Sequence, residues 1–118
     1  MDIKEIDSNA LKTKLDKGEK LLLIDLLGEK SYESLHLPQA ISVDPSDGFV
    51  PRVTESVGGD LSQLVVVYGA SFKDELSTRK VEELLLAGFT NVRDFKGGLK
   101  DWAAELLPFE GKRAPSAK

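Results

Sequence analysis

The sequence contains no cysteine, and this absence excludes several kinds of chemistry. None of its 118 residues is a cysteine, and only one, His36, is a histidine. Disulfides, thiolate metal sites and catalysis by a thiol are therefore excluded. The single histidine also argues against a histidine-based metal site and against a Ser-His catalytic pair. We predict neither a metal site nor a cofactor.

The chain has fewer basic than acidic residues and lacks long apolar runs. The formal net charge is −4, with 16 lysines and arginines against 20 aspartates and glutamates. A broad basic face, which would attract nucleic acids or anionic membranes, is therefore not expected. The apolar runs are too short to span a bilayer, and the first residues lack the apolar stretch of a secretory signal. We predict a cytoplasmic protein that binds neither nucleic acid nor membrane.

The remaining composition is the ordinary balance of a globular domain. Hydrophobic residues make up 41% of the chain and charged residues 31%, and the length suits a single core. We predict one domain over residues 1–111. Residues 112–118 lack apolar periodicity, so we predict a disordered tail there.

Short apolar runs alternate with amphipathic segments, which is typical of an α/β fold with a mainly parallel sheet. Strands are predicted over residues 3–6, 21–24, 40–43, 64–68 and 91–95. Helices are predicted after the capping residue Ser8, over residues 29–35, from Asp74 or Ser77 to Gly88, and after Gly97 and Gly98. Residues 44–60 hold two prolines and three glycines, so we predict a loop with room for one helical turn.

The last predicted helix has an apolar stripe at helical spacing. Leu99, Trp102, Ala103 and Leu106 follow one another at i, i+3, i+4 and i+7. Such a stripe is typical of a helix face that packs on a core. We therefore predict that Trp102 is a packing residue and does not contact a ligand.

Four stretches of the chain, taken in order, carry a resemblance. They are Leu23-Ile24-Asp25; Tyr32 through His36-Leu37-Pro38-Gln39-Ala40-Ile41; Val65-Val66-Val67-Tyr68-Gly69; and Gly88-Phe89-Thr90-Asn91-Val92 with the later Gly97-Gly98-Leu99 and Trp102. Together they resemble the rhodanese-like domain, the fold of sulfurtransferases that dual-specificity cell-cycle phosphatases also use. The resemblance runs from Ile3 to Gly111. It implies a three-layer α/β/α structure with a five-stranded parallel sheet of strand order 3-2-4-5-1.

The resemblance also implies that residue 69 is the position of the family's nucleophilic cysteine. Gly69 stands there, so we predict a vestigial active-site loop and no catalytic residue. The loop consists of Gly69, Ala70, Ser71, Phe72, Lys73, Asp74, Glu75 and Leu76. In the family, backbone N–H groups and a helix N-terminus lower the pKa of the thiol. Glycine offers no nucleophile, and neither Ser71 nor Ser77 has an evident base beside it.

Other positions depart from the family pattern as well. In the loop, Lys73 is followed by Asp74 and Glu75, and this excess of negative charge disfavours thiosulfate or phosphate. Leu26-Leu27 stand where the family commonly has an arginine after the strand, and family glycines are replaced by Leu35 and Gln39. These departures indicate change beyond a single site.

Two further residues, Asp25 and His36, are predicted at the rim of the pocket. For Asp25 we favour a structural role, as a strand-end carboxylate bonded to backbone N–H groups. For His36 the resemblance implies a packing role in a loop. Phe72 either lies exposed at the loop tip, where it would suit a partner, or packs inside. Asp74 and Glu75 are either solvated or part of the first helical turn, where acids suit the helix dipole.

These features favour a rhodanese-like domain without catalytic activity that binds a protein partner or a small ligand at the loop. The alternative is a thiosulfate or persulfide sulfurtransferase whose nucleophilic cysteine at position 69 has been replaced in this chain. Asp74-Glu75 and Leu26-Leu27 weigh against that alternative. A phosphatase is a third hypothesis. It needs both a cysteine and an anion-binding arginine, and Arg79 lies within the predicted helix.

Overall fold

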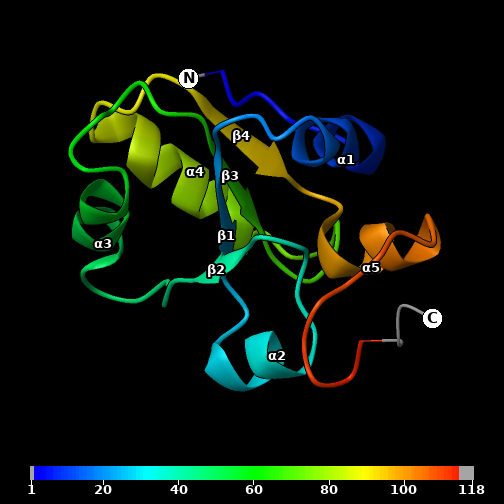
Figure 1. The fold of residues 1–118 in the computed structure, drawn as a ribbon. Coiled ribbons are helices and arrows are strands. Elements are labelled where there is room, and N and C mark those ends of the chain that lie inside the picture. The colour runs from blue at the N-terminus through cyan, green and yellow to red at the C-terminus, as the bar shows by residue number, and fades with distance from the viewer. Residues whose placement is uncertain (1, 115–118) are drawn as a thin grey trace.

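A parallel sheet of four short strands forms the middle layer of the structure (Figure 1), a computed structural model that describes residues 2–114. The strands are β1 (Leu22–Asp25), β2 (Ile41–Ser42), β3 (Val65–Tyr68) and β4 (Val92–Phe95), and their order in the sheet is β2-β1-β3-β4. All three neighbouring pairs are parallel. Continuous apolar runs such as β3 form central strands because a parallel sheet is covered on both faces.

The predicted fifth strand, over residues 3–6, is wrong as a strand. The segment makes one parallel bridge, between Glu5 and Asp94. Two backbone hydrogen bonds support it, from Asp94 N to Lys4 O at 2.9 Å and from Ile6 N to Asp94 O at 3.1 Å. The chain leaves the sheet after this bridge because Asp7 already caps a helix. The segment nevertheless lies beside β4, as the predicted order 3-2-4-5-1 requires.

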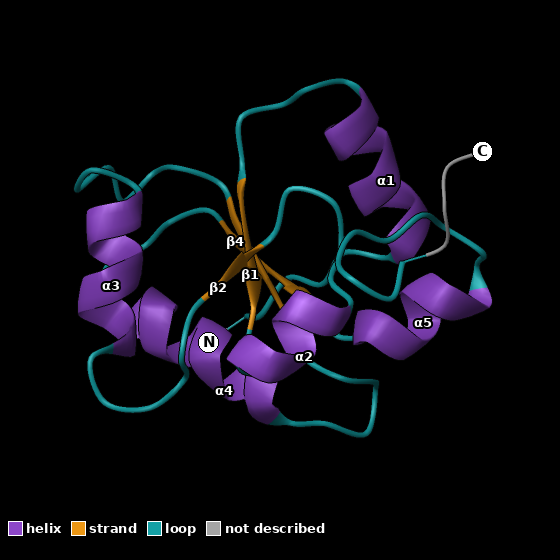
Figure 2. Ribbon diagram, turned by 60° about the horizontal axis from the view of Figure 1, so that its bottom comes forward, coloured by secondary structure: helices purple, strands orange, loops and turns teal. Residues whose placement is uncertain are grey.

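Residues 2–114 form five helices, which are α1 (Ser8–Asp16), α2 (Glu29–Ser34), α3 (Phe49–Ser56), α4 (Leu76–Leu86) and α5 (Gly98–Ala104). Four of them cover the two faces of the sheet, and α2 lies beyond the end of the strands (Figure 1). Seen with the sheet edge-on, α3 and α4 lie on one side and α1 and α5 on the other (Figure 2). This arrangement is the predicted three-layer α/β/α fold, and it leaves the loops at the ends of the strands to form a site.

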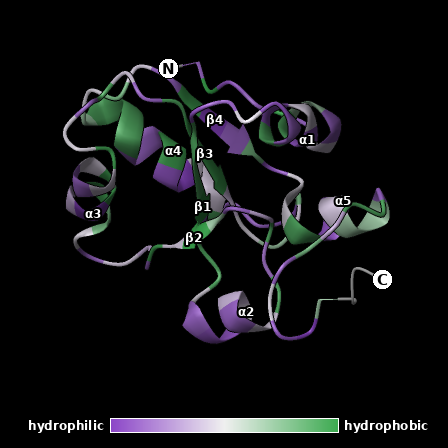
Figure 3. Ribbon diagram, in the orientation of Figure 1, coloured by the Kyte–Doolittle hydropathy of each residue, from purple (hydrophilic) through white to green (hydrophobic). Residues whose placement is uncertain are grey.

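The side chains of β3 contribute to two separate apolar clusters, because successive side chains of a strand point to opposite faces of the sheet. Val65 and Val67 pack with the residues of α3 and α4. Val66 and Tyr68 pack with the residues of α1 and α5. The strands β1 and β3, which lie between the helices, are coloured mostly as hydrophobic (Figure 3). Trp102 of α5 is fully buried in the second cluster, which confirms its predicted packing role. The rest of the predicted stripe is only partly right, because Ala103 is exposed and Leu106 is 91% exposed and lies after the end of α5.

The segment 44–60 was predicted as a loop with room for one helical turn, and its middle part forms a longer helix than predicted. Phe49–Ser56 form the two-turn helix α3, which buries Phe49 and Val53. Pro51 is compatible with the helix because it lies in the first turn, where a backbone N–H has no intrahelical partner. Gly48 precedes the helix with φ of 88°. The glycines and prolines therefore mark the ends of a helix instead of excluding one.

The beginning of α1 also differs from its prediction. Asp7, and not Ser8, is the N-cap, and its carboxylate accepts a hydrogen bond from Ala10 N at 2.8 Å. Ser8 is the first helical residue and is buried. Both side chains are good caps, so composition alone could not separate the two neighbouring positions.

The chain after α5 returns to α2. Lys112 N donates to Glu33 O, and Arg113 N donates to Ser34 O, each at 2.8 Å. The predicted tail 112–118 therefore begins with residues bonded to α2, and residues 115–118 lie outside the described part of the chain. Within residues 2–114, no helix combines the length and the apolar character needed to cross a membrane.

The helix α3 makes a direct stability prediction. We expect Phe49→Ala to lower the free energy of unfolding by about 3–5 kcal/mol, because it removes a buried ring from the core. Urea denaturation of the parent and the variant measures this difference. Glu55→Ala, at an exposed position of the same helix, should change it by less than about 0.5 kcal/mol. Equal small effects of both substitutions would contradict a packed α3.

Candidate functional site

The candidate site is the loop between β3 and α4, at the carboxyl end of the sheet. The first turn of α5 holds it in place, since Leu99 N donates to Gly69 O at 3.1 Å and Lys100 N donates to Ala70 O at 2.9 Å. The approach is so close that a Cβ on Gly98 would lie 2.3 Å from Gly69 O. Gly98 also has φ of 61°, so both its conformation and its lack of a side chain serve this contact.

The carboxylate of Asp74 turns back into this loop and lies beside Gly69. A Cβ built on Gly69 would be 2.8 Å from Asp74 Oδ2. The same oxygen accepts a hydrogen bond from Ala70 N at 3.3 Å, and Oδ1 accepts one from Leu76 N at 2.9 Å. The carboxylate of Asp74 therefore accepts hydrogen bonds from two backbone N–H groups of the loop. It does so beside residue 69, where the resemblance implies a nucleophile.

The rest of the loop faces outward. Phe72 is 58% exposed, which settles the alternative between an exposed and a packed ring. Lys73 is exposed too, and its backbone N–H donates to Ser71 Oγ at 3.3 Å. Glu75 is exposed and forms a long ion pair with Lys96, with 3.5 Å between Oε1 and Nζ. Lys96 Nζ is otherwise buried and has no hydrogen bond within the described residues.

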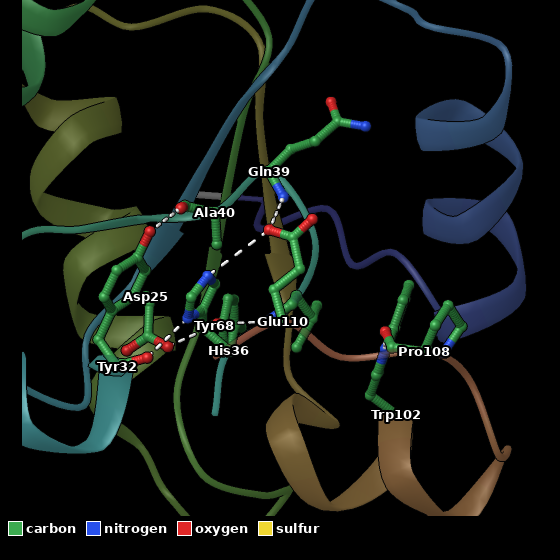
Figure 4. Close-up of polar contacts among 10 residues, drawn as sticks. Asp25, Tyr32, His36, Gln39, Ala40, Tyr68, Trp102, Pro108 and Glu110 are labelled. Carbon is green, nitrogen blue, oxygen red and sulfur yellow. Dashed lines mark hydrogen bonds and ion pairs between the residues drawn. The ribbon is translucent and has the colours of Figure 1, made fainter. Parts of the chain in front are cut away.

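Asp25 lies fully buried at the end of β1 and is part of a hydrogen-bond chain (Figure 4). Its Oδ1 accepts from Leu27 N at 2.8 Å, and its Oδ2 accepts from the hydroxyl of Tyr68. The Tyr68 oxygen in turn accepts from Leu37 N at 3.1 Å. Burial raises the pKa of Asp25 above its ordinary value, against the lowering effect of these hydrogen bonds.

The pKa of Tyr68 is also raised, first by burial and then by the charge of Asp25. The hydroxyl therefore remains a hydrogen-bond donor at physiological pH. This chain connects β1, β3 and the segment before β2, which suits the structural role favoured for Asp25. No described contact links Asp25 to the loop 69–76.

His36 belongs to a second cluster at this end of the sheet (Figure 4). Its ring stacks on Tyr32 with a centroid distance of 3.8 Å. Its Nδ1 lies 2.6 Å from Tyr32 O, and its Nε2 lies 3.6 Å from Glu110 Oε1. The contacts hold the C-terminal segment against α2, and they use both ring nitrogens. The assignment of Asp25 and His36 to a pocket rim stays a prediction.

Beneath the start of α4, a buried carboxylate accepts hydrogen bonds from two hydroxyls. Asp94, on β4, accepts from Ser77 Oγ at 2.7 Å and from Thr78 Oγ1 at 2.6 Å. Because Asp94 and Ser77 are both buried, this arrangement fixes α4 on the sheet and offers no group to a substrate. Among residues 2–114, no three histidine, aspartate or glutamate side chains are grouped to hold a metal ion.

Two pockets flank the exposed ring of Phe72. One, of about 290 Å³, lies between the loop and α5 and is lined by Ser71, Phe72, Lys73, Lys100, Asp101 and Ala104. The other, of about 310 Å³, lies toward the N-terminal segment and is lined by Glu5, Ile6, Asp7, Phe72, Phe95, Lys96, Gly97 and Asp101. Each is large enough for one side chain or a small ligand.

Sequence reasoning grouped the loop residues but missed the contacts of Tyr68 and Asp94 and the inward turn of Asp74. Tyr68 was assigned only to a strand, although it stands opposite Asp25 in the register of β1 and β3. Adjacent strand ends predict such a contact. Asp94 carried no comparable signal, because its partners lie 16 and 17 positions away. Asp74 and Ser77 were considered as caps of α4, but Glu75 is the N-cap and Asp74 lies one residue before it. The position of the Asp74 carboxylate beside Gly69 depends on the path of the loop.

Comparisons with known proteins agree with this geometry. The profile of the rhodanese-like domain family matches residues 7–105. "Putative sulfurtransferase YtwF" of Bacillus subtilis is 29% identical over 108 residues, which cover 92% of this chain and 98% of that protein. The rhodanese-like domain of Alr3790 from Anabaena has a TM-score of 0.81 and 32% identity, over 100% of this chain and 88% of that one.

A larger protein shares the fold. Thiosulfate sulfurtransferase from Pseudomonas aeruginosa has a TM-score of 0.81 at 22% identity, and the similarity covers 98% of this chain and 22% of that chain. At this identity the similarity concerns the fold alone.

The close approach of α5 to the loop can be tested with two matched glycines. Gly98 and Gly18 have φ of 61° and 68°, but a Cβ on Gly18 would meet nothing within 4 Å. Both Gly→Ala variants should lose about 1–2 kcal/mol of unfolding free energy through backbone strain. Gly98→Ala should lose about 1–3 kcal/mol more through the clash with Gly69 O. Thermal or urea denaturation measures both, and equal losses would contradict the contact.

The buried carboxyl of Asp25 predicts a pH effect on stability. A folded-state pKa raised above the unfolded value stabilises the protein fully below about pH 4, and this contribution is lost as pH rises through the folded pKa. We therefore expect the parent to lose stability relative to Asp25→Asn as pH rises from about 4 to 8. Urea denaturation across this range measures the difference. Asp47→Asn, at an exposed position, is the control, and a pH-independent difference for Asp25→Asn would contradict the prediction.

Proposed function

The chain belongs to the rhodanese-like domain family, and on this premise we propose that it is a non-catalytic binding or regulatory module. The family is related to sulfurtransferases, as the name of its Bacillus relative indicates. A sulfurtransferase attacks a sulfane sulfur with a thiolate, holds the sulfur as a persulfide and passes it to an acceptor. Gly69 supplies no atom for the first of these steps.

The observation that carries the proposal is the position of the Asp74 carboxylate. Its Oδ2 lies 2.8 Å from the place where the Cβ of a side chain on residue 69 would stand, and the carboxylate accepts hydrogen bonds from the amides of Ala70 and Leu76. A carboxylate there repels an incoming anion and disfavours a neighbouring thiolate. The loop is therefore occupied from within, in addition to lacking a nucleophile.

Neither nearby serine replaces the missing thiol. Ser77 donates to Asp94, which resembles a nucleophile beside a base, but its side chain is buried and out of reach of a substrate. Ser71 is partly exposed, and its described side-chain contact is with the backbone N–H of Lys73. A serine nucleophile needs an adjacent general base. These contacts support a non-catalytic loop.

The alternative is a sulfurtransferase whose cysteine at position 69 has been replaced in this chain. The name of the Bacillus relative favours it. The position of Asp74 weighs against it, because a cysteine at residue 69 would bring its Cβ close to a carboxylate oxygen. A cysteine codon at position 69 of the native gene would decide for the alternative. The cytoplasmic location predicted from the sequence remains a prediction.

The proposal predicts the behaviour of three forms of the chain in a thiosulfate:cyanide sulfurtransferase assay. The parent should show no turnover, because it has no thiol. Gly69→Cys should remain almost inactive, because Asp74 raises the thiol pKa above its ordinary value of about 8.5. Gly69→Cys with Asp74→Asn should have the lower thiol pKa of the two. The pH dependence of iodoacetamide alkylation measures both values.

The conservative Asp74→Asn exchange keeps the size of the side chain and one oxygen for the amide of Leu76. Asp47→Asn in the Gly69→Cys background, at an exposed position outside the loop, is the matched control. Turnover by the parent would overturn the proposal. Rapid turnover by Gly69→Cys alone would show a competent cradle and would favour the replaced-cysteine alternative.

A further inference from the structure

Phe72 is an exposed aromatic residue on a loop that is held at several points. Its ring is 58% exposed. The loop is bonded to α5 through Gly69 O and Ala70 O, and Asp74 N donates to Ser71 O at 3.0 Å across the tip. A loop held in this way loses little backbone conformational entropy on binding. Aromatic residues are common anchors of protein interfaces.

The pocket beside this ring has a mainly apolar lining and two lysines. It holds about 290 Å³ between the loop and α5, and its apolar lining residues are Phe72 and Ala104. Lys73 and Lys100 are exposed at its border, and neither forms an ion pair with another described residue. Asp101 is the one acid in the lining, so the formal charge is +1 in a chain of −4.

The opposite side of Phe72 differs in charge. The second pocket is lined by Glu5, Asp7 and Asp101 against a single lysine, Lys96, and Lys96 is already opposed by Glu75. An acidic ligand would be repelled there and attracted on the α5 side. The ring of Phe72 thus separates a site for acidic groups from one that disfavours them.

From these contacts we infer that the pocket between Phe72 and α5 docks a segment of a partner protein that carries an apolar side chain next to acidic residues. The apolar side chain would enter the pocket against Phe72 and Ala104, and the acids would pair with Lys73 and Lys100. The volume is at the low end of small-molecule sites, about 300–1,000 Å³, and suits one large side chain of a longer segment. This inference rests on the proposed function, because it names the partner of that same loop.

Peptide titration followed by NMR tests the inference on the whole chain. The probes are acetyl-Glu-Glu-Phe-Gly-Gly-amide and its reversed-order form, with comparators that carry Lys for Glu or Ala for Phe. At low salt, at least one of the two acidic peptides should saturate the protein at about tenfold lower peptide concentration than the same peptide with Lys in place of Glu. The amide resonances of Phe72, Lys73 and residues 100–104 should shift most.

Matched variants separate the pocket from general effects. Phe72→Ala and Lys100→Glu should each weaken binding by about fivefold or more. Leu86→Ala removes another exposed apolar side chain, and Lys30→Glu reverses another exposed charge near a helix start; both should change binding by less than about twofold. The NMR spectrum of each variant shows directly whether it is folded.

Three results would overturn the docking site: no saturation by either acidic peptide, equal binding by Phe72→Ala, or resonance shifts confined to another surface. Equally tight binding of free 3-phenylpropionate would assign the pocket to a small carboxylate and overturn the protein segment. The sulfurtransferase assay is independent of these results. Turnover by a chain that binds the peptide would overturn the proposed function alone, and a silent chain that binds no peptide would overturn docking alone.

Discussion

Burial of β3 on both faces is the constraint on which the site depends. Every residue of Val65–Tyr68 is inaccessible to solvent, and the two faces contribute to different apolar clusters. The strand therefore cannot slip in register without placing side chains in the wrong cluster. Its carboxyl end then fixes two features at once: Tyr68 meets Asp25 on the neighbouring strand, and Gly69 begins the loop under α5.

The contacts that position the loop do not depend on the chemical groups that the loop carries. The contacts that hold the loop use backbone atoms of Gly69, Ala70 and the first turn of α5, and they need no particular side chain at residue 69. A thiol in such a loop needs amides that are free to stabilise negative charge. Here the carboxylate of Asp74 receives two of them. The fold is thus compatible with a loop in which the carboxylate of Asp74 is the bound anion. A rhodanese-like fold does not by itself carry sulfurtransferase activity.

Much of the fold could be predicted because its signals are local. The apolar runs of β1 and β3, the burial of Trp102 and the glycine that ends α4 each follow from neighbouring residues, although Leu106 of the same predicted stripe is exposed. The failures have physical causes as well. Residues 3–6 have the composition of a strand, but the cap at Asp7 ends it after one bridge. The helix α3 was hidden by Gly48 and Pro51, which occupy positions that a helix start accepts.

The site was predicted less completely than the fold because its key contacts depend on the path of one loop. Residues 69–76 were predicted as one loop, and Leu76 is in fact the first residue of α4. No local pattern shows that Asp74 points inward while Phe72 points outward. The two orientations are linked. A turn closed by the bond from Asp74 N to Ser71 O presents the tip at Phe72 to solvent, while the carboxylate behind it bonds back to Ala70. The inward position of the Asp74 carboxylate and the exposure of Phe72 thus both follow from one path of the loop backbone. Under the proposed function, a loop in which Asp74 bonds to the inner amides would recognise its partner with the outer face, where Phe72 is exposed.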